Sequence, residues 1–449
     1  MKKITLKLIT VLFVILNATS VSSQCWKEIE TGYITSLALK NDGTLWKWGS
    51  GTNTPTQMGT DSNWKTISKG ADHTLAIKTD GTLWAWGSNT YGQCGNGIFG
   101  GNEIANPTQI GTATDWNSVS AGNYHSMAVK TDGTLWALGD NAFGELGIGS
   151  TTNQNLPIQV GTATNWKSVS ASYYFTLALK TDGTLWAWGI GSHGQLGTGS
   201  FGSSNIPGQV GTSTNWNVVV AGDYRHSVGI KTDGTLWAWG RNNYGELGDG
   251  TTANKNIPTQ IGADNDWNFV TSGDESTYAI KTNGTLWGWG YNANGLLGDG
   301  TTTDKHIPTQ IGINNTWKKV SLHQNHTIAL RTDDNLWAWG NNFNGQLGTG
   351  NNLSQLTPVA VACPTSLEIS DFFTKEFSTF PNPTTGIITI SNEDNLTIDK
   401  IEILDILGKT VSVKTDNTSQ VDISNVAKGI YIFKIYSGET VFQNKIIKQ

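Results

Sequence analysis

The pentapeptide Leu83-Trp84-Ala85-Trp86-Gly87 is the most informative stretch of this 449-residue chain. The same five residues return at 185–189, 236–240 and 336–340, and copies with one residue changed stand at 45–49, 135–139 and 286–290. After a first interval of 38 residues, the copies follow one another every 50 to 52 residues. A fixed period of this length is typical of a solenoid, a propeller or an array of repeats.

A second tryptophan opens each unit, 20 or 21 residues before the first tryptophan of the pentapeptide. These opening residues are Trp26, Trp64, Trp116, Trp166, Trp216, Trp267 and Trp317. Together with the pentapeptides they account for all 20 tryptophans of the chain. A residue type confined to repeat positions serves packing rather than chemistry. Because indole rings bury large areas, we expect them to form the joints between units.

The second unit shows the expected strands. Residues 64–68 and 73–78 have strand patterns, and Thr79-Asp80-Gly81 is a hairpin turn that leads into a returning strand at 82–87. A loop rich in glycine and asparagine, residues 88–106, precedes a last short strand at 107–110. Four short antiparallel strands per unit predict an all-β chain with a seven-bladed β-propeller of about 50-residue repeats over residues 24–363. A β-helix is the alternative, but the Asp-Gly hairpins argue against it.

The first unit is shorter than the others by about a dozen residues. It passes from Gly49 almost directly to its last strand at Pro55-Thr56-Gln57 and lacks the long loop.

Two further runs resemble a known family. Val-Ser-Ala-Gly-Asn-Tyr-His-Ser-Met-Ala-Val at 119–129 and Asn-Asn-Tyr-Gly-Glu-Leu-Gly-Asp-Gly-Thr at 242–251 are similar to the repeats of the regulator of chromosome condensation (alpha-tubulin suppressor-like) family. The resemblance covers residues 26–362 and implies a seven-bladed propeller. It implies less about function, because one fold carries many activities. The eukaryotic namesake acts on a small GTPase and on chromatin, but this chain has a net charge of −6, so we expect no nucleic-acid partner.

Residues 1–23 have the features of a secretory signal peptide: Lys2, Lys3 and Lys7, an apolar core at 9–16, and small residues before a cut at Gln24. A short N-terminal anchor is the alternative. No other stretch is apolar enough to cross a bilayer, so no transmembrane segment is expected.

The repeat pattern stops after Pro364, and residues 364–377 are interpreted as a linker. Residues 378–449 form a small β-sandwich-like domain that opens with Pro381-Asn382-Pro383, contains Gly429-Ile430-Tyr431 and ends in a basic strand. These features resemble the type A C-terminal sorting domain of the type IX secretion system of Bacteroidota. The resemblance implies contact with that machinery and release or display outside the outer membrane. A small accessory β domain is the alternative.

The repeats contain no pattern that predicts catalysis. His73, His125, His226 and His326 share one position, but Thr35, Phe175 and Ser276 replace them in the other units. A side chain that hydrogen-bonds a turn explains this better than a metal ring. No nucleophile elbow, Walker loop or His-Glu-x-x-His motif occurs. We therefore predict no catalytic, cofactor or metal residues. An extracellular glycan-active hydrolase or lyase and a structural or adhesive surface protein are the alternatives to a binding module.

Aromatic residues break the repeat in the turns and loops, where a rigid frame suits ligand binding. A protein or a glycan is the expected ligand, and packing between blades is the alternative explanation. The predicted ligand face comprises Tyr91, Tyr124, Tyr173, Tyr174, Tyr224, Arg225 and Tyr244.

The chain has three cysteines. Cys94 stands where other units have leucine and is expected to be buried. Cys25 precedes the first unit and Cys363 follows the last, so in a closed ring they should approach each other. We predict a disulfide between them, with Cα atoms within about 7 Å; two free thiols are the alternative.

Overall fold

The structure is a computed structural model that describes residues 25–100, 103–364, 377–391, 397–406, 408–414, 419–437 and 440–449. The predicted signal peptide and most of the predicted linker lie outside the described residues. Residues 1–363 and 364–449 form two separate units.

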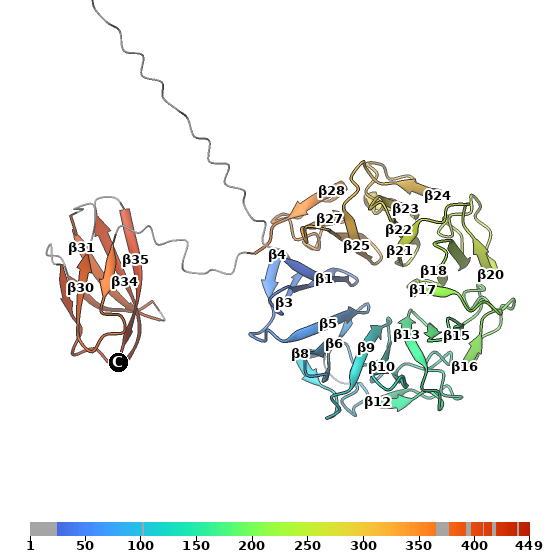
Figure 1. Cartoon of the computed structure of the whole chain (residues 1–449), viewed down its shortest axis with the longest axis horizontal. Helices are drawn as coiled ribbons and strands as arrows, with labels where there is room; N and C mark the ends of the chain where they lie inside the picture. Colours follow the sequence, from blue (N-terminus) through green and yellow to red (C-terminus); the bar gives the residue numbers. More distant parts are fainter. Residues whose placement is uncertain are drawn as a thin grey trace, which may run out of the picture. The chain divides into compact units, whose positions relative to one another are not determined.

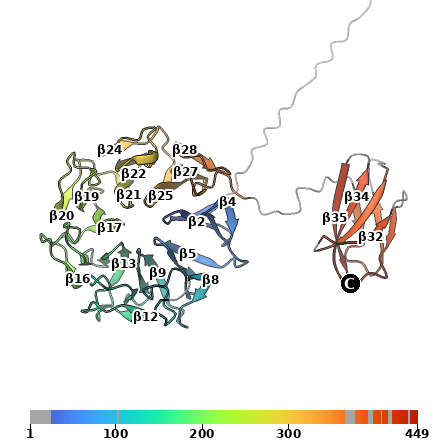
Figure 2. The same cartoon turned by 180° about the vertical axis from the view of Figure 1, so that it is seen from behind.

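The first unit is a propeller of seven four-stranded antiparallel sheets, each built from four consecutive strands. In Figures 1 and 2 the first strand of each blade lies nearest the centre and the fourth lies at the rim. The innermost strands are β1 (Trp26–Thr31), β5 (Trp64–Lys69), β9 (Trp116–Ala121), β13 (Trp166–Ala171), β17 (Trp216–Ala221), β21 (Trp267–Ser272) and β25 (Trp317–Leu322). The second strands are β2 (Thr35–Lys40), β6 (His73–Lys78), β10 (His125–Lys130), β14 (Phe175–Lys180), β18 (His226–Lys231), β22 (Ser276–Lys281) and β26 (His326–Arg331).

The third strands carry the pentapeptides. They are β3 (Leu45–Gly49), β7 (Leu83–Gly87), β11 (Leu135–Gly139), β15 (Leu185–Gly189), β19 (Leu236–Gly240), β23 (Leu286–Gly290) and β27 (Leu336–Gly340). The outermost strands are β4 (Thr52–Gln57), β8 (Ile104–Gln109), β12 (Gln154–Gln159), β16 (Ser204–Gln209), β20 (Lys255–Gln260), β24 (Lys305–Gln310) and β28 (Gln355–Val361). A short 3-10 turn, η1 (Ala293–Gly295), lies in the loop of the sixth blade. The outer strand of the second blade begins earlier than the predicted 107–110, because Gly87 pairs with Ile104.

The predicted hairpin explains why the tryptophans recur with the Asp-Gly turn. Asp80 accepts hydrogen bonds from the backbone N–H of Thr82 at 3.0 Å and from its hydroxyl at 2.6 Å. The Thr82 hydroxyl in turn accepts the indole N–H of Trp84 at 2.8 Å. Gly81 has a φ of 80°, and a Cβ there would lie 2.0 Å from the Thr114 carbonyl oxygen, so only glycine fits. The turn therefore positions the first tryptophan of the pentapeptide.

Neighbouring blades share their apolar cores. One cluster joins Leu75, Ile77 and Leu83 of the second blade to Trp116 and Ala128 of the third. Another joins blade seven to blade one, with Leu330 and Leu336 packed in the same cluster as Trp26 and Ile29. The tryptophans are thus the joints between blades, and the ring is closed.

No sheet combines the two ends of the array, so the closing contact lies between two complete blades. Cys25 and Cys363 form a disulfide there, with a Cα–Cα distance of 6.1 Å. Lys319 and Glu30 form an ion pair of 3.0 Å across the same junction. Cys94 is a buried free cysteine, as its replacement of leucine predicts.

The C-terminal unit consists of two small sheets. One contains β29 (Ser378–Phe380), β30 (Ile387–Ser391) and β33 (Gln420–Asp422); the other has the order β32 (Thr410–Lys414), β31 (Lys400–Asp405), β34 (Gly429–Ser437) and β35 (Thr440–Lys448). Asn382 of the Pro-Asn-Pro run binds the last strand, donating to the Lys445 carbonyl at 2.6 Å and accepting from the Ile447 N–H at 2.9 Å. Among the described residues, no helix combines the length and apolar character needed to cross a membrane.

Candidate functional site

One face of the propeller carries both sets of segments that vary between repeats. In an antiparallel blade, the turn after the first strand and the loop after the third strand emerge at the same end. We call this end the loop face; its turns cover residues 32–34, 70–72, 122–124, 172–174, 222–225, 273–275 and 323–325. All seven predicted ligand residues lie on it. Tyr91 and Tyr244 stand in loops, and the others stand in turns.

The predicted tyrosines form a continuous row of ring contacts. Tyr91 and Tyr124 have centroids 5.2 Å apart, Tyr124 and Tyr173 are 5.4 Å apart, and Tyr173 lies 4.1 Å from Tyr174 and 6.3 Å from Tyr224. The row therefore runs from the loop of the second blade to the turn of the fifth.

Residues outside the predicted ligand face extend this row. Phe143 lies 4.8 Å from Tyr174. The guanidinium group of Arg241 lies over the rings of Tyr224, at 4.8 Å, and Tyr244, at 5.4 Å, and Tyr244 contacts Tyr291 at 5.0 Å. We define the aromatic row as Tyr91, Tyr124, Phe143, Tyr173, Tyr174, Tyr224, Tyr244 and Tyr291.

The row combines packing between blades with exposure to solvent. The ring before the loop glycine lies on the turn of the following blade, as Tyr91 does on Tyr124 and Phe143 does on Tyr174. Tyr173 and Tyr174 are nevertheless only half-buried, and Tyr224 and Phe143 are exposed. These rings therefore pack between blades while part of their surface stays open to solvent.

Hydrogen bonds and charge hold the row in place. A hydrogen bond that the Tyr124 hydroxyl donates to Tyr173, together with burial, raises the pKa of Tyr124 to about 12, so its hydroxyl stays neutral. Arg241 is buried and paired with Glu275 at 2.6 Å and Glu246 at 3.6 Å. A guanidinium fixed in this way stacks on its neighbouring rings without freedom to swing away.

The repeated histidines serve as links between blades. Their Nε2 atoms lie 2.8 to 3.0 Å from a hydroxyl on the second strand of the next blade, in the pairs His73–Ser126, His125–Thr176, His226–Thr277 and His326–Ser36. The prediction that these histidines hydrogen-bond a turn is therefore wrong, because each imidazole reaches across the blade junction to a strand. Burial lowers the pKa of each of these histidines to about 3, so all four are neutral.

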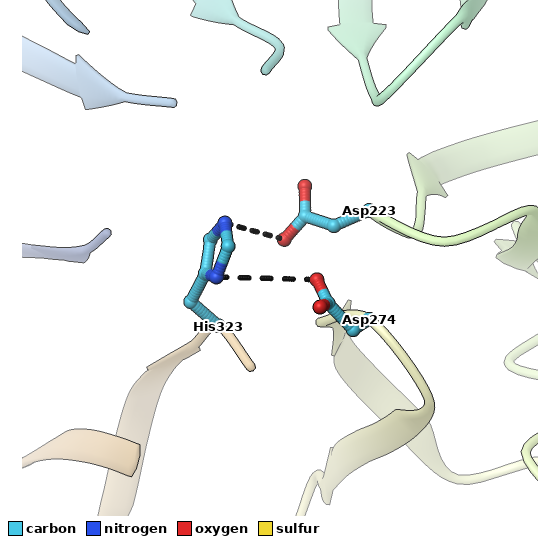
Figure 3. Close-up of side chains that lie close together, drawn as sticks. All are labelled: Asp223, Asp274 and His323. Atoms are coloured by element: carbon cyan, nitrogen blue, oxygen red, sulfur yellow. Dashed lines mark ion pairs between the residues drawn. The ribbon is translucent and has the colours of Figure 1, made fainter. Parts of the chain in front are cut away.

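Three other side chains converge near the centre of the loop face (Figure 3). Asp223, Asp274 and His323 come from the turns of the fifth, sixth and seventh blades. His323 Nε2 lies 3.8 Å from Asp223 Oδ2, and His323 Nδ1 lies 3.9 Å from Asp274 Oδ1. The imidazole is buried, whereas the two carboxylates are partly open to solvent.

These three are the described residues that could hold a metal ion, since one ligand atom from each lies within 4.8 Å of the others. However, the backbone N–H of Gln324 donates to His323 Nδ1 at 2.8 Å, so in the neutral ring the proton is on Nε2. A metal would have to displace that proton or the backbone donor. Burial raises the pKa of Asp223 to about 7, opposed by His323 and reinforced by Asp274. A carboxyl with a raised pKa is a weaker metal ligand near neutral pH, because more of it is protonated.

Sequence reasoning did not single out this cluster, although a signal is present. His323 stands where the other units have glycine or serine, namely Gly32, Gly70, Gly122, Ser172, Gly222 and Gly273. Arg241 and Tyr291, which extend the row, each follow a pentapeptide directly.

Comparison with known proteins agrees with this architecture. Residues 65–375 match the family model of the RCC1-like domain, and residues 378–449 match that of the secretion system C-terminal sorting domain. The structure is similar to human WBSCR16, at 22% identity and a TM-score of 0.63, over 70% of this chain and 86% of that one. It is also similar to yeast RCC1 (Prp20) crystallised with Kap60, at 16% identity and a TM-score of 0.64, over 85% and 92% of the two chains. At these identities the structural likeness shows the fold alone. The chain belongs to the RCC1-like domain family, as a β-propeller exported through its type IX sorting domain to the cell exterior or the outer-membrane surface.

Proposed function

We propose that this propeller is an extracellular binding module whose aromatic row contacts a protein partner. The observation that carries the proposal is the continuity of the row. Its rings touch from the second blade to the sixth, with Arg241 bridging Tyr224 and Tyr244. Tyrosine and arginine anchors of this kind dominate the binding energy of protein interfaces.

The geometry of the rings favours a protein over a glycan. Neighbouring rings meet at steep angles, such as 62° between Tyr124 and Tyr173 and 84° between Tyr173 and Tyr174. They therefore offer edges, hydroxyls and small clefts rather than one flat stacking platform. Their mutual contacts also fix the rotamers before binding, which lowers the entropic cost of association.

Fewer observations support the alternative function, a glycan-active hydrolase. Two carboxylates, Asp223 and Asp274, do approach each other on the loop face, but His323 stands against both of them. Glycoside hydrolysis needs a gap of roughly 5–9.5 Å between carboxyl groups that is open to the sugar. The buried imidazole fills that position.

The test uses the mature protein with a photo-crosslinking residue placed at Tyr174, in the row, or at Tyr33. Tyr33 is a matched control, because it stands in the equivalent turn region of the first blade, is exposed, and contacts His323 rather than the row. We expect one crosslinked protein from the native extracellular milieu at position 174 and not at 33.

The affinity of the purified partner should then fall at least tenfold for Tyr174→Ala and stay within twofold for Tyr33→Ala. Equal affinity for both variants would remove the row from the interface. Retrieval of a glycan alone would favour the glycan alternative, and retrieval of no soluble partner would favour the structural one.

A further inference from the structure

Each long loop after a third strand closes over the next blade through one backbone carbonyl that accepts hydrogen bonds from that blade. In the fourth blade the Gln195 carbonyl oxygen accepts the indole N–H of Trp239 at 2.9 Å and the hydroxyl of Ser227 at 2.8 Å, both from the fifth blade. Equivalent carbonyls at Gln93, Glu145, Glu246, Leu296 and Gln346 accept from the blade that follows each of them. One backbone carbonyl per junction is thus the standard link.

The junction between the first and second blades lacks this link. The first blade passes from β3 to β4 through Ser50 and Gly51 alone, so no loop reaches Trp86 and Thr74 of the second blade. Thr35 also replaces the histidine that would reach Thr74. Among the described residues, the Trp86 indole N–H and the Thr74 hydroxyl have no hydrogen-bond partner.

Trp86 and Thr74 are more exposed to solvent than their equivalents, because no loop covers them. Trp86 is 7% exposed, whereas its equivalents Trp48, Trp188, Trp239, Trp289 and Trp339 are at most 1% exposed. Thr74 is 3% exposed, whereas the equivalent hydroxyl residues are fully buried. Both side chains are therefore less completely covered than their equivalents at the other junctions.

A cavity occupies the place of the missing loop. A space of about 390 Å³ is lined by Thr35, Ser50, Lys69, Asp72 and Glu103, among others, and a second of about 120 Å³, which shares four of its lining residues, reaches Thr74 and Trp86. The larger volume lies within the range of ordinary ligand sites. Its position between blades one and two follows directly from the shortened first repeat.

Charged residues that break the repeat gather around this cavity. Lys69 stands where the other units have Thr31, Ala121, Ala171, Ala221, Ser272 and Leu322. Lys47 replaces the alanine of the pentapeptide, and Glu103 belongs to the extended loop of the second blade. Burial lowers the pKa of Lys69 to about 8, with Asp72 and Glu103 opposing the shift. The walls thus offer charges of both signs, which suits a polar polypeptide segment.

We propose that the cavity between the first and second blades binds a glycine-containing turn of a partner polypeptide, with one backbone carbonyl accepting from Trp86 Nε1 and Thr74 Oγ1. The other junctions of the ring provide the template for this occupant, because an acceptor carbonyl held by a loop containing glycine fills the equivalent place. This site is independent of the aromatic row. None of the row tyrosines lines either of the two spaces at this junction.

The probe is a backbone-cyclised peptide carrying residues 341–354, the loop whose Gln346 carbonyl accepts from Trp48 and Ser36. The ends of this loop approach each other, since the Asn342 N–H donates to Ser354 Oγ at 3.2 Å, so cyclisation preserves its shape and lowers the entropic cost of binding. Binding to the mature protein is measured by calorimetry and by the indole N–H resonance of Trp86, assigned with Trp86→Phe.

We expect saturable binding that shifts the Trp86 resonance. Thr74→Val should weaken it about fivefold to tenfold, as expected for loss of one hydrogen bond. Thr176→Val is the matched control, because Thr176 is already bonded to the Glu145 carbonyl, and should leave the affinity unchanged. Tyr174→Ala should also leave it unchanged, which separates this site from the proposed partner face.

A graft of residues 341–354 in place of Ser50 and Gly51 provides the second measurement. The grafted loop should occupy the cavity, abolish peptide binding and slow the hydrogen exchange of the Trp86 indole. Absence of peptide binding, equal affinity for wild type and Thr74→Val, or undiminished binding to the folded graft would each overturn the proposal.

Discussion

Removal of the disulfide between Cys25 and Cys363 is expected to destabilise the propeller more than any single core substitution. The two residues are 338 positions apart, and every blade of the propeller is built from consecutive strands, so this bond is the covalent closure of the ring. In the chain-entropy model, a closed loop of this length lowers the entropy of the unfolded chain by about 19 cal/mol/K, or about 5.8 kcal/mol at 25 °C. Residual structure in the unfolded chain makes this an upper value.

The native ring should survive the loss. The non-covalent contacts across the same junction include the Lys319–Glu30 ion pair and a 3.0 Å hydrogen bond from the Thr31 N–H to Ser321. The bond acts mainly on the unfolded chain, so the effect should appear in the free energy of unfolding rather than in the folded spectrum. Blades one and seven should become the first to exchange their amide hydrogens.

The assay compares urea unfolding of the mature wild type and of the Cys25→Ala/Cys363→Ala variant, each with and without reductant. Reductant should lower the urea midpoint of the wild type to that of the variant and leave the variant unchanged. Cys94 is free and buried in both proteins, so any effect of reductant on this thiol is the same in both. A midpoint that responds to reductant in neither protein, or three titratable thiols in the oxidised wild type, would refute the reasoning.

Four further predictions follow from individual residues. The pKa of each inter-blade histidine is lowered to about 3, so the unfolded chain takes up protons before the folded chain does on acidification. The free energy of unfolding should therefore fall between about pH 6.5 and pH 3, by at most about 1.4 kcal/mol per pH unit per histidine. Urea midpoints that do not change over this pH range would contradict the prediction. The pKa of Asp223 is raised to about 7, so its contribution to stability is present below about pH 4 and is lost as pH rises through 7. The free energy of unfolding of Asp223→Asn relative to wild type should therefore increase over this pH range. The opposite trend in the same titration would show that the pKa of this carboxyl is not raised. Trp188→Phe removes the indole N–H that donates to the Glu145 carbonyl and should cost about 1 kcal/mol more in the free energy of unfolding than Trp86→Phe, whose indole N–H is unpaired. Equal costs for the two variants would show that this hydrogen bond does not stabilise the junction. A stop codon after Pro364 should leave folded propeller in the periplasm, as measured by cell fractionation, and normal secretion of the truncated chain would show that residues 378–449 are dispensable for export.

The fold was predictable because each blade is specified locally. The hairpin of Thr79-Asp80-Gly81, the alternation of residues 73–78 and the tryptophan pairs all belong to one stretch of about 25 residues, and the structure forms strands there with the expected pairing. Because the same pattern recurs in seven units, a strand and turn pattern that is weak in one unit becomes clear in the whole array. The sorting domain was predictable for a different reason, since its Pro-Asn-Pro start and basic last strand resemble a known domain, and the family model matches residues 378–449.

The residues of the proposed ligand face could be singled out only as exceptions to the repeat. Departure from the consensus marked Tyr173, Tyr174 and Tyr224, but it did not indicate that their rings touch. Those contacts depend on the angle between blades, which places the loop of one unit over the turn of the next. Arg241 and Tyr291 were not predicted, because a single residue after the pentapeptide glycine belongs to no recognisable sequence pattern.

The sequence by itself determined the number of blades, the hairpins, the sorting domain and the closeness of the two ends of the array, because each of these follows from local pattern and period. The tertiary structure alone decided which distant residues meet. Asp223, Asp274 and His323 lie about 50 residues apart along the chain and converge only because three successive turns face the centre of one ring. The cavity beside Trp86 likewise appears only when the short first blade is set against the second, since a missing loop leaves a space whose walls belong to its neighbours.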